Sequence, residues 1–449
     1  MASISVKSIR LGSGAGYSGD RIEPALALAE NGRLDYLIFE CLAERTIALA
    51  QQQKAGNPNS GYDPMLVKRM KALLPICHKN GVKIISNMGA ANPVAAMEET
   101  ARIARELGLK GLKIAAVTGD DVLEAIEGGD YRFLESGLPL SKLEGRLLSA
   151  NAYLGAAPLV ETLENGADVV LTGRVADPVL FTAPLIWEFG WDMKDYRLMG
   201  QGIVLGHLME CAGQITGGYF ADPGYKDVPN LAQLGFPIAE ASSEGDFTIT
   251  KLKDTGGQVT LPGCKEQLLY EIHDPANYLT PDVIADFTGV TMEEIARDVV
   301  KVTGGMGRPK TGKLKVSVGY KDGYIGEGQI SYGGSGALER ARLGLEIVRD
   351  RFRLTGQEFR EVRFDLIGYN SLYGNRLAKG SPREVRARVA GRTDDPETAA
   401  AIGNEIETLY TNGPAGGGGV TKSVQAVVAV QSILIDESLI RIKNHYTQT

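Results

Sequence analysis

The sequence predicts an α/β protein in which a doubly wound, mostly parallel sheet is followed by a smaller α+β domain. Through the first half, short β-branched runs alternate with segments of helical periodicity, a pattern typical of βαβ units. After residue 309 the order of elements changes to several strands around two helices. A chain of 449 residues also exceeds what one hydrophobic core usually holds, so more than one domain is expected.

Residues 1–240 form the predicted α/β domain. Helices are expected at residues 21–30, 64–79, 93–107, 158–164 and 202–215. Asp20 is expected to cap the first helix, and Asn92, followed by Pro93, to cap the third.

Residues 241–308 are expected to connect the two domains and to pack on the first. An antiparallel pair of strands is predicted at 247–252 and 258–260, with helices near 265–271 and at 291–300. The glycine-rich stretch 304–310 is the best candidate for a linker.

Residues 309–449 form the predicted α+β domain. Asp322 and Gly323 have the composition of a hairpin turn between strands 314–320 and 324–331. The remaining elements are expected as helices at 337–351 and 396–409 and strands at 361–369, 384–390 and 425–435. This order gives a two-layer arrangement of helices on a sheet.

Composition excludes several classes of protein. A net charge of −7 without basic clusters argues against nucleic-acid binding. No apolar run reaches the length of a membrane span and no signal peptide is recognisable. The four cysteines form no CxxC pair, so neither a zinc ribbon nor a disulfide framework is expected. These features predict a cytoplasmic protein without a membrane or nucleic-acid partner.

Several predicted strands end in small polar residues, and ligands bind along this edge of a parallel sheet. Asn87 follows one strand and is expected to donate to a substrate carboxylate or carbonyl. Arg174 follows another, and its guanidinium could hold a carboxylate or phosphate in two-point contact. Asp177 lies three residues further on, so a purely structural Arg–Asp bridge is the alternative. Asn92 is explained by helix capping and is a weaker candidate for substrate binding.

The loop after the first strand allows two interpretations. Gly14, Gly16 and Gly19 have the spacing of a dinucleotide fingerprint, and Glu40 ends the next strand. A negative charge on Asp20 at the helix entrance would repel a pyrophosphate. A tight turn that presents Asp20 and Arg21 is therefore favoured, and no cofactor is predicted.

Later candidates come from the predicted helix 202–215. His207, Glu210, Cys211 and Gln214 share one face at helical spacing. Glu210 is the better general acid or base, because apolar surroundings would raise its pKa. The motif lacks a second histidine, so no metal site is expected, and Cys211 is expected to be an inert buried thiol. His273, beside Asp274, is a candidate for substrate binding.

The combination of these motifs resembles the acyclic terpene utilisation (AtuA) family, formerly a domain of unknown function. The residues that carry the resemblance are 14–21 (GAGYSGDR), 86–93 (SNMGAANP), 172–178 (TGRVADP), 210–218 and 270–275 (YEIHDP). The resemblance implies a bacterial-type catabolic context beside enzymes of branched acyl-CoA thioesters. The resemblance also implies that longer members carry a small ferredoxin-like domain at the C-terminus, and it suggests a separate ferredoxin-like subunit as a partner of this chain.

The expected function is that of a catabolic enzyme acting on a small carboxylate or a branched acyl-CoA thioester, with lyase, hydratase or hydrolase chemistry. Arg174 and Asn87 would bind the acid or the thioester carbonyl, and Glu210, Asp20 or Asp177 would move the proton. CoA would then enter as part of the substrate. A non-catalytic scaffold subunit and a nucleotide-dependent enzyme are the alternatives. A homo-oligomer is expected, and whether the glycine-rich loop 413–419 binds a ligand stays open.

Overall fold

The computed structural model describes residues 7–143 and 145–449 and confirms the α/β class. The chain divides into two compact units. The first comprises Met1–Gly319 and Val430–Thr449, and the second comprises Tyr320–Ala429. The predicted third segment, 309–449, therefore does not coincide with the second unit, because the end of the chain belongs to the first.

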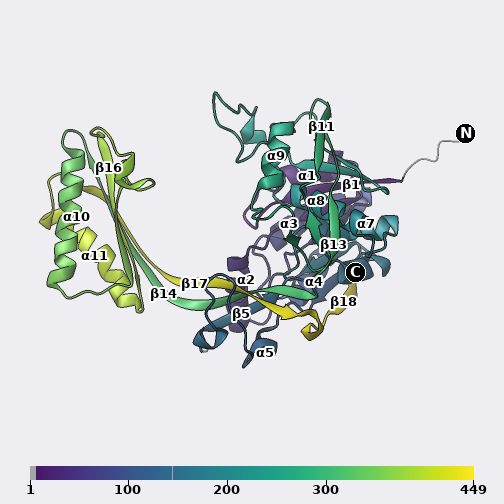
Figure 1. Ribbon diagram of the computed structural model, residues 1–449, viewed down its shortest axis with the longest axis horizontal. Coiled ribbons are helices and arrows are strands. Elements are labelled where there is room, and N and C mark those ends of the chain that lie inside the picture. Colours follow the sequence, from purple (N-terminus) through teal and green to yellow (C-terminus); the bar gives the residue numbers. More distant parts are fainter. Residues whose placement is uncertain (1–6, 144) are drawn as a thin grey trace, which may run out of the picture. The chain divides into compact units, whose positions relative to one another are not determined.

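A ten-stranded sheet forms the centre of the first unit (Figure 1). In spatial order its strands are β11 (Thr291–Ala296), β12 (Val299–Thr303), β8 (Phe247–Lys251), β7 (Pro237–Ser242), β1 (Ser8–Ala15), β2 (Tyr36–Phe39), β3 (Lys83–Ser86), β6 (Val169–Thr172), β4 (Lys113–Thr118) and β18 (Lys443–Gln448). The five strands from β1 to β4 are parallel, and antiparallel strands extend the sheet on both sides. The sheet is thus mixed, with a parallel core.

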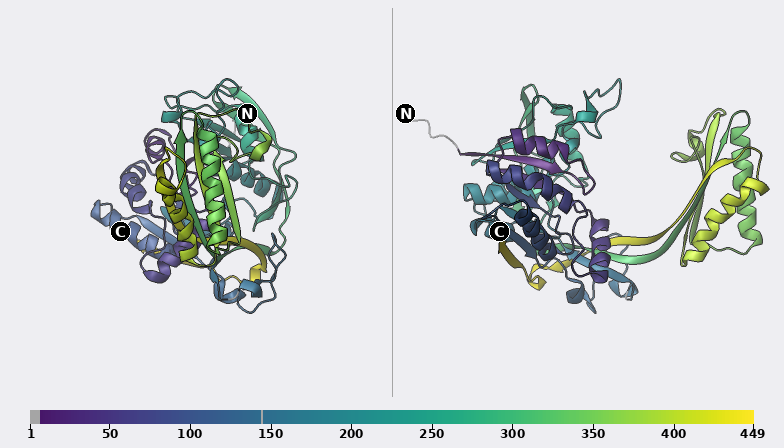
Figure 2. Two further views of the ribbon diagram at one scale, coloured as in Figure 1. Left: turned by 90° about the vertical axis from the view of Figure 1, so that its left-hand side faces the viewer. Right: turned by 180° about the vertical axis from the view of Figure 1, so that it is seen from behind.

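Helices cover both faces of this sheet, as expected for a doubly wound fold (Figures 1 and 2). One face packs against α1 (Glu23–Asn31), α3 (Leu66–Asn80) and α4 (Pro93–Glu106). The other packs against α6 (Ala157–Glu164), α7 (Val179–Phe189) and α8 (Tyr196–Glu210). Successive strand residues alternate between the two cores, with Ile38 in one and Leu37 and Phe39 in the other. Because the five strands of the core are parallel, their carboxyl ends all lie at one edge.

The prediction of a helix at 291–300 is wrong. This segment forms β11 and β12, and β12 pairs with β8 through Val300 and Ile249. Val300 and Val302 are buried, so pairing with the sheet edge overrides a helical spacing of apolar residues. The predicted strand 258–260 is not formed.

The prediction of a linker at 304–310 is also wrong. Its residues include β13 (Met306–Pro309), which joins β10 (Val283–Asp286) and β9 (Tyr278–Leu279) in a three-stranded sheet. At Gly307 a Cβ atom would lie 2.4 Å from the Tyr196 carbonyl oxygen. The glycines therefore permit a close approach to α8 rather than flexibility.

The second unit contains antiparallel strands with α10 (Ala337–Leu354) and α11 (Pro396–Asn412). Its strands are β14 (Lys313–Gly333), β15 (Glu361–Ile367), β16 (Glu384–Thr393) and β17 (Gly418–Asp436), and β14 and β17 both continue into the first unit. The predicted turn at Asp322 and Gly323 is wrong, because β14 runs through it without a break. Asp322 instead accepts hydrogen bonds from Arg360 and Arg392.

The remaining elements of the first unit are α2 (Glu44–Gly56), α5 (Leu123–Ile126), β5 (Leu147–Ala152) and α9 (Leu261–Leu269). Among the described residues no helix is both long and apolar enough to cross a bilayer.

Candidate functional site

Three acidic side chains and one arginine meet near the carboxyl ends of β2 and β6. We call Glu40, Asp177, Glu210 and Arg174 the carboxyl cluster. Glu40 follows β2, Arg174 and Asp177 follow β6, and Glu210 ends α8. Electrostatic coupling connects Asp177 with both glutamates, and Arg174 opposes the burial penalty of each acid.

Arg174 lies at the centre of this cluster and is almost fully buried. Its side chain donates hydrogen bonds to the carbonyl oxygens of Leu42 and Val175 and to Asp177 Oδ1. Its guanidinium carbon lies 4.6 Å from the centre of the Tyr153 ring. Because protein acceptors engage every side-chain nitrogen, Arg174 orders the loops around it, and its predicted contact with substrate stays a prediction.

Asn87 fixes the position of Glu40. The Asn87 Oδ1 atom accepts the Cys41 backbone N–H at 2.7 Å, and its Nδ2 donates to Glu40 Oε1 at 3.0 Å. Glu40 Oε1 also accepts the Leu42 N–H. Burial and the nearby charge of Asp177 raise the pKa of Glu40 to about 8 although these hydrogen bonds lower it. Glu40 therefore holds or releases a proton near neutral pH.

The hydrogen bonds of His207 show that Glu210 carries a proton. Burial lowers the pKa of His207 to about 4, so the ring is neutral at pH 7. Its Nε2 lies 3.0 Å from the Gln267 carbonyl oxygen, which can only accept, so Nε2 carries the hydrogen. Nδ1 is then an acceptor, and Glu210 Oε1, 3.0 Å away, must donate.

Glu210 is consequently a neutral carboxylic acid. Burial, followed by the charges of Asp177 and Glu271, raises its pKa well above the ordinary value. The rings of Tyr278 and Phe287 flank His207 at 5.8 and 5.4 Å between centroids. The second oxygen, Glu210 Oε2, is buried and has no hydrogen-bond partner among the described residues, a cost that a bound ligand could remove.

Asp177 is the more accessible acid, with a third of its side chain exposed. Burial raises its pKa, whereas the charge of Arg174 acts in the opposite direction. Nearby, Lys315 Nζ lies 2.6 Å from Glu44 Oε1, which also accepts the Tyr153 hydroxyl at 2.7 Å. Lys315 also lowers the pKa of Asp177, and it is partly exposed. It is thus an accessible cation beside the cluster.

In the glycine-rich loop after β1, a side chain of the loop accepts a hydrogen bond from the loop's own backbone. The Gly16 N–H donates to Asp20 Oδ2 at 3.0 Å, and a Cβ at Gly16 would lie 2.7 Å from the backbone of Cys211. The prediction that Asp20 caps α1 is wrong, because the cap position is Ile22 and no side chain bonds there. Arg21 donates to the carbonyl oxygens of Leu231 and Ala232. Neither residue is brought into the carboxyl cluster by a described contact.

The other predicted residues lie apart from the cluster. Asn92 caps α4 as predicted, accepting the Ala95 N–H, and its Nδ2 donates to the carbonyl oxygens of Pro58 and Ser60. These bonds explain Asn92 by structure alone. His273 is exposed in the loop after α9. Its predicted role in binding is not tested by any contact.

Sequence reasoning missed three participants. Asp120 follows β4 and accepts the Arg174 backbone N–H and the Asn151 amide, both at 2.9 Å. Its position at a strand end was a usable signal, as was that of Glu44 after β2. Lys315 gave none, because it lies on β14, far along the chain, and only β5–β14 pairing brings it near.

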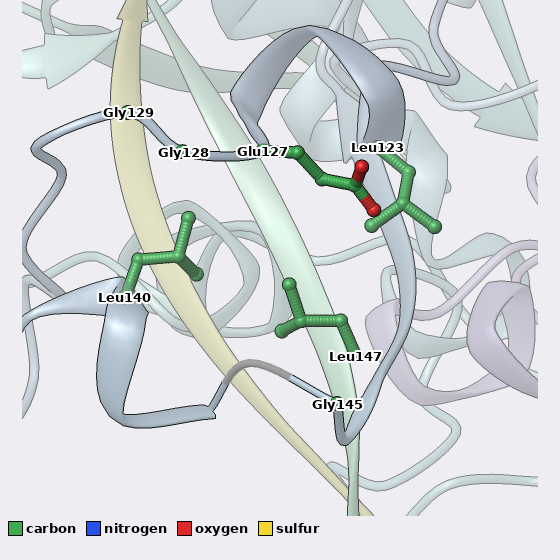
Figure 3. A pocket seen from close by; sticks show the side chains of 7 residues that line it. All are labelled: Leu123, Glu127, Gly128, Gly129, Leu140, Gly145 and Leu147. Atoms are coloured by element: carbon green, nitrogen blue, oxygen red, sulfur yellow. The ribbon is translucent and has the colours of Figure 1, made fainter.

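A cavity of about 380 Å³ lies beside α5 and β5 (Figure 3). Leucines and glycines line it together with Glu127, whose carboxylate lies beside Leu123. This lining offers little chemistry compared with the carboxyl cluster. Within the described ranges, no three or more metal-ligating side chains are placed so that they could hold a metal ion.

Comparison with known proteins gives one result for the whole chain. Neither the search of curated proteins nor that of solved structures found a match. The model of the acyclic terpene utilisation family protein AtuA matches residues 9–446 and so includes every residue of the carboxyl cluster. The chain belongs to the acyclic terpene utilisation (AtuA) family.

Proposed function

We propose that the protein is an acid–base enzyme of lyase or hydratase type that acts on a small carboxylate or a branched acyl-CoA thioester. The observation that carries the proposal is the Glu210–His207 pair, which keeps a proton on a buried carboxyl group at neutral pH. Family membership implies a role in acyclic terpene utilisation. Acyclic terpenes have branched, unsaturated chains, so hydration and bond-cleaving steps suit their breakdown.

The different environments of Glu210 and Asp177 suit them to different roles in proton transfer. Glu210 is neutral and mostly buried, which suits a general acid. Asp177 is ion-paired with Arg174 and partly exposed, which suits a carboxylate base. Environments that push the pKa values of neighbouring acids apart are a general way of assigning such roles.

A dehydration shows how the groups would act. Asp177 removes a proton from the carbon next to the acyl carbonyl, and the released electron pair forms a carbon–carbon double bond. The carbon–oxygen bond at the next carbon breaks, and the Glu210 O–H turns from His207 Nδ1 to the departing hydroxyl and gives it the proton, so that the hydroxyl leaves as water. Hydration is the same step in reverse.

Substrate binding is assigned to the exposed cation of the site. Lys315 is partly exposed, whereas Arg174 is enclosed, so Lys315 would meet an incoming carboxylate or thioester. Hydrolysis through Cys211 receives no support, because burial raises the pKa of its thiol and disfavours the thiolate.

The test is an assay of wild type and Glu210→Gln with branched 3-hydroxyacyl-CoA and enoyl-CoA substrates, followed by the absorbance of the unsaturated thioester. A glutamine amide can still donate to His207 Nδ1, so the fold should persist. Loss of the acid should lower kcat about 10²–10⁴-fold.

Glu164→Gln, the same change on the exposed end of α6, is the control and should keep full activity. An active Glu210→Gln variant would refute the proposed acid. A wild-type protein that neither turns over nor is stabilised by any of these thioesters or small carboxylates would overturn the enzyme proposal in favour of a scaffold.

A further inference from the structure

A second polar groove lies in the second unit. It has a volume of about 320 Å³ and is formed by α10, β15 and the loop that follows β15. This volume is at the lower end of the range for small-molecule sites. The side chains that define its chemistry are Arg342, Glu346, Arg349, Tyr369 and Asn375.

Two guanidinium groups in this groove are held by aromatic rings rather than by acids. Arg349 lies 4.5 Å from the centre of the Phe364 ring, and Arg342 lies 5.2 Å from that of Tyr369. Arg342 donates one hydrogen bond, to the Tyr369 hydroxyl at 3.2 Å. Each guanidinium has five N–H donors, so most donors have no protein acceptor within the described part of the chain.

Two other arginines of the same unit, by contrast, are each bonded to several protein acceptors. Arg388 is bonded to Glu327 and Asp365, and Arg340 to the carbonyl oxygens of Gly333 and Ala415. Glu346 lies four residues after Arg342 and three before Arg349, yet it forms an ion pair with neither in the described structure. The groove thus keeps cations and an acid apart, each open to a ligand.

The loop from residue 368 to 383 adds further positive charge. It contains Arg376, Lys379 and Arg383 and no acidic residue. Asn375 Oδ1 accepts a bond from Asn370, so the Asn375 amide N–H groups are left for a ligand. A positive local field in a protein of net charge −7 favours an anion here.

We propose that this groove binds the phosphate-bearing end of a nucleotide. The planar guanidinium groups of Arg342 and Arg349 bond the phosphate oxygens. Glu346 accepts from the ribose hydroxyls or an amino group, and Asn375 donates to the remaining acceptors. Free adenine nucleotides and the nucleotide end of coenzyme A share this chemistry. The proposal is independent of the acid–base function and stands or falls without it.

The experiment is calorimetric titration of the full-length protein with ADP, coenzyme A, inorganic phosphate and adenosine. ADP or coenzyme A should bind, and adenosine, which lacks phosphate, should not. Binding of both probes would identify their shared nucleotide end, and binding of one would identify the source. The double variant Arg342→Gln with Arg349→Gln should lower the affinity for the probe that binds by at least about tenfold.

Arg353→Gln is the matched control, because it removes the same charge from an exposed position on α10, and it should change affinity less than about twofold. Arg349→Lys should weaken binding to an intermediate degree, because lysine keeps the charge but loses the planar fork. The proposal is overturned if no probe binds, if inorganic phosphate binds as tightly as the nucleotides, or if the double variant binds like wild type.

Discussion

Two buried arginines stand near the carboxyl ends of the parallel strands, and they do different things. Arg69 on α3 contacts Cys41 Sγ at 3.1 Å and donates to the carbonyl oxygens of Tyr17 and Asp20. Its nearest acid is Asp63, at 3.8 Å. Arg174, by contrast, is surrounded by the acids of the carboxyl cluster.

This difference indicates that Arg69 has a structural role, whereas Arg174 belongs to the candidate reactive site. Arg69 joins the loops after β1 and β2 through mainly uncharged acceptors, none of which exchanges protons near neutral pH. Arg174 joins neighbouring loops too, but it lowers the pKa of three coupled carboxyl groups that burial raises. Burial of an arginine alone is therefore no sign of function, whereas several titratable carboxyl groups around it are such a sign.

The largest expected effects come from replacing each of the two arginines with methionine, which tests the difference between them. Arg69→Met should lower the free energy of unfolding by about 3–5 kcal/mol, because it leaves Asp63 buried without its cation. Arg174→Met should also be destabilising, but in addition it should raise the pKa of Glu40, Asp177 and Glu210. Urea unfolding measures the first effect, and the infrared band of protonated carboxyl groups at neutral pH measures the second.

Arg174→Met should gain protonated carboxyl signal from the carboxyl cluster, whereas Arg69→Met can add only the signal of Asp63, whose pKa Arg69 lowers. If Arg69→Met shows the same gain, the two arginines are not distinct in the way described.

A smaller effect concerns pH. The pKa of Glu40 is raised from about 4.5 to about 8 on folding, so the folded state binds more protons than the unfolded state between these values. Its contribution to stability is complete below pH 4.5 and is lost as the pH rises through 8. One such group gives a slope of at most about 1.4 kcal/mol per pH unit.

Glu40→Gln keeps the acceptor oxygen for Asn87 and Leu42 and removes the titration. Its stability should match wild type near pH 4 and exceed it near pH 8, as measured by urea unfolding across that range. Parallel curves for the two proteins would show that Glu40 does not titrate there.

The smallest effect compares two asparagines. Asn87→Ala leaves the buried Cys41 N–H without an acceptor and should cost about 1–3 kcal/mol. Asn92→Ala removes a helix cap and should cost about 1 kcal/mol. Asn87→Ala should also raise the pKa of Glu40 further, since that hydrogen bond lowers it.

Asn92→Ala should leave the pH dependence of stability unchanged. A shift in that variant would mean that the α4 cap is linked to the carboxyl cluster, contrary to the contacts of Asn92.

Local signals predicted much of the first unit. Alternating apolar runs and Asn92 before Pro93 correctly predicted parallel strands and helices on both faces. The polar strand ends singled out Asn87, Arg174, Asp177 and later Glu210, whose roles stay predictions. The wrong predictions concern short segments whose secondary structure depends on what they pack against. These segments form β11, β12, β13 and the unbroken β14. The return of β18 beside β4, carrying His445, had no local signal at all.

The sequence by itself determined the fold class, the edge of the sheet that carries the candidate chemistry and most of the acids there. Only the tertiary structure decided that Arg174 is enclosed by protein acceptors, that Asp20 serves its own loop, and that Lys315 comes from β14. It also located the proton of Glu210, because that proton depends on the burial of His207 and on the Gln267 carbonyl, 60 residues away. Periodicity and capping act between neighbours in sequence, whereas desolvation and charge coupling act between neighbours in space.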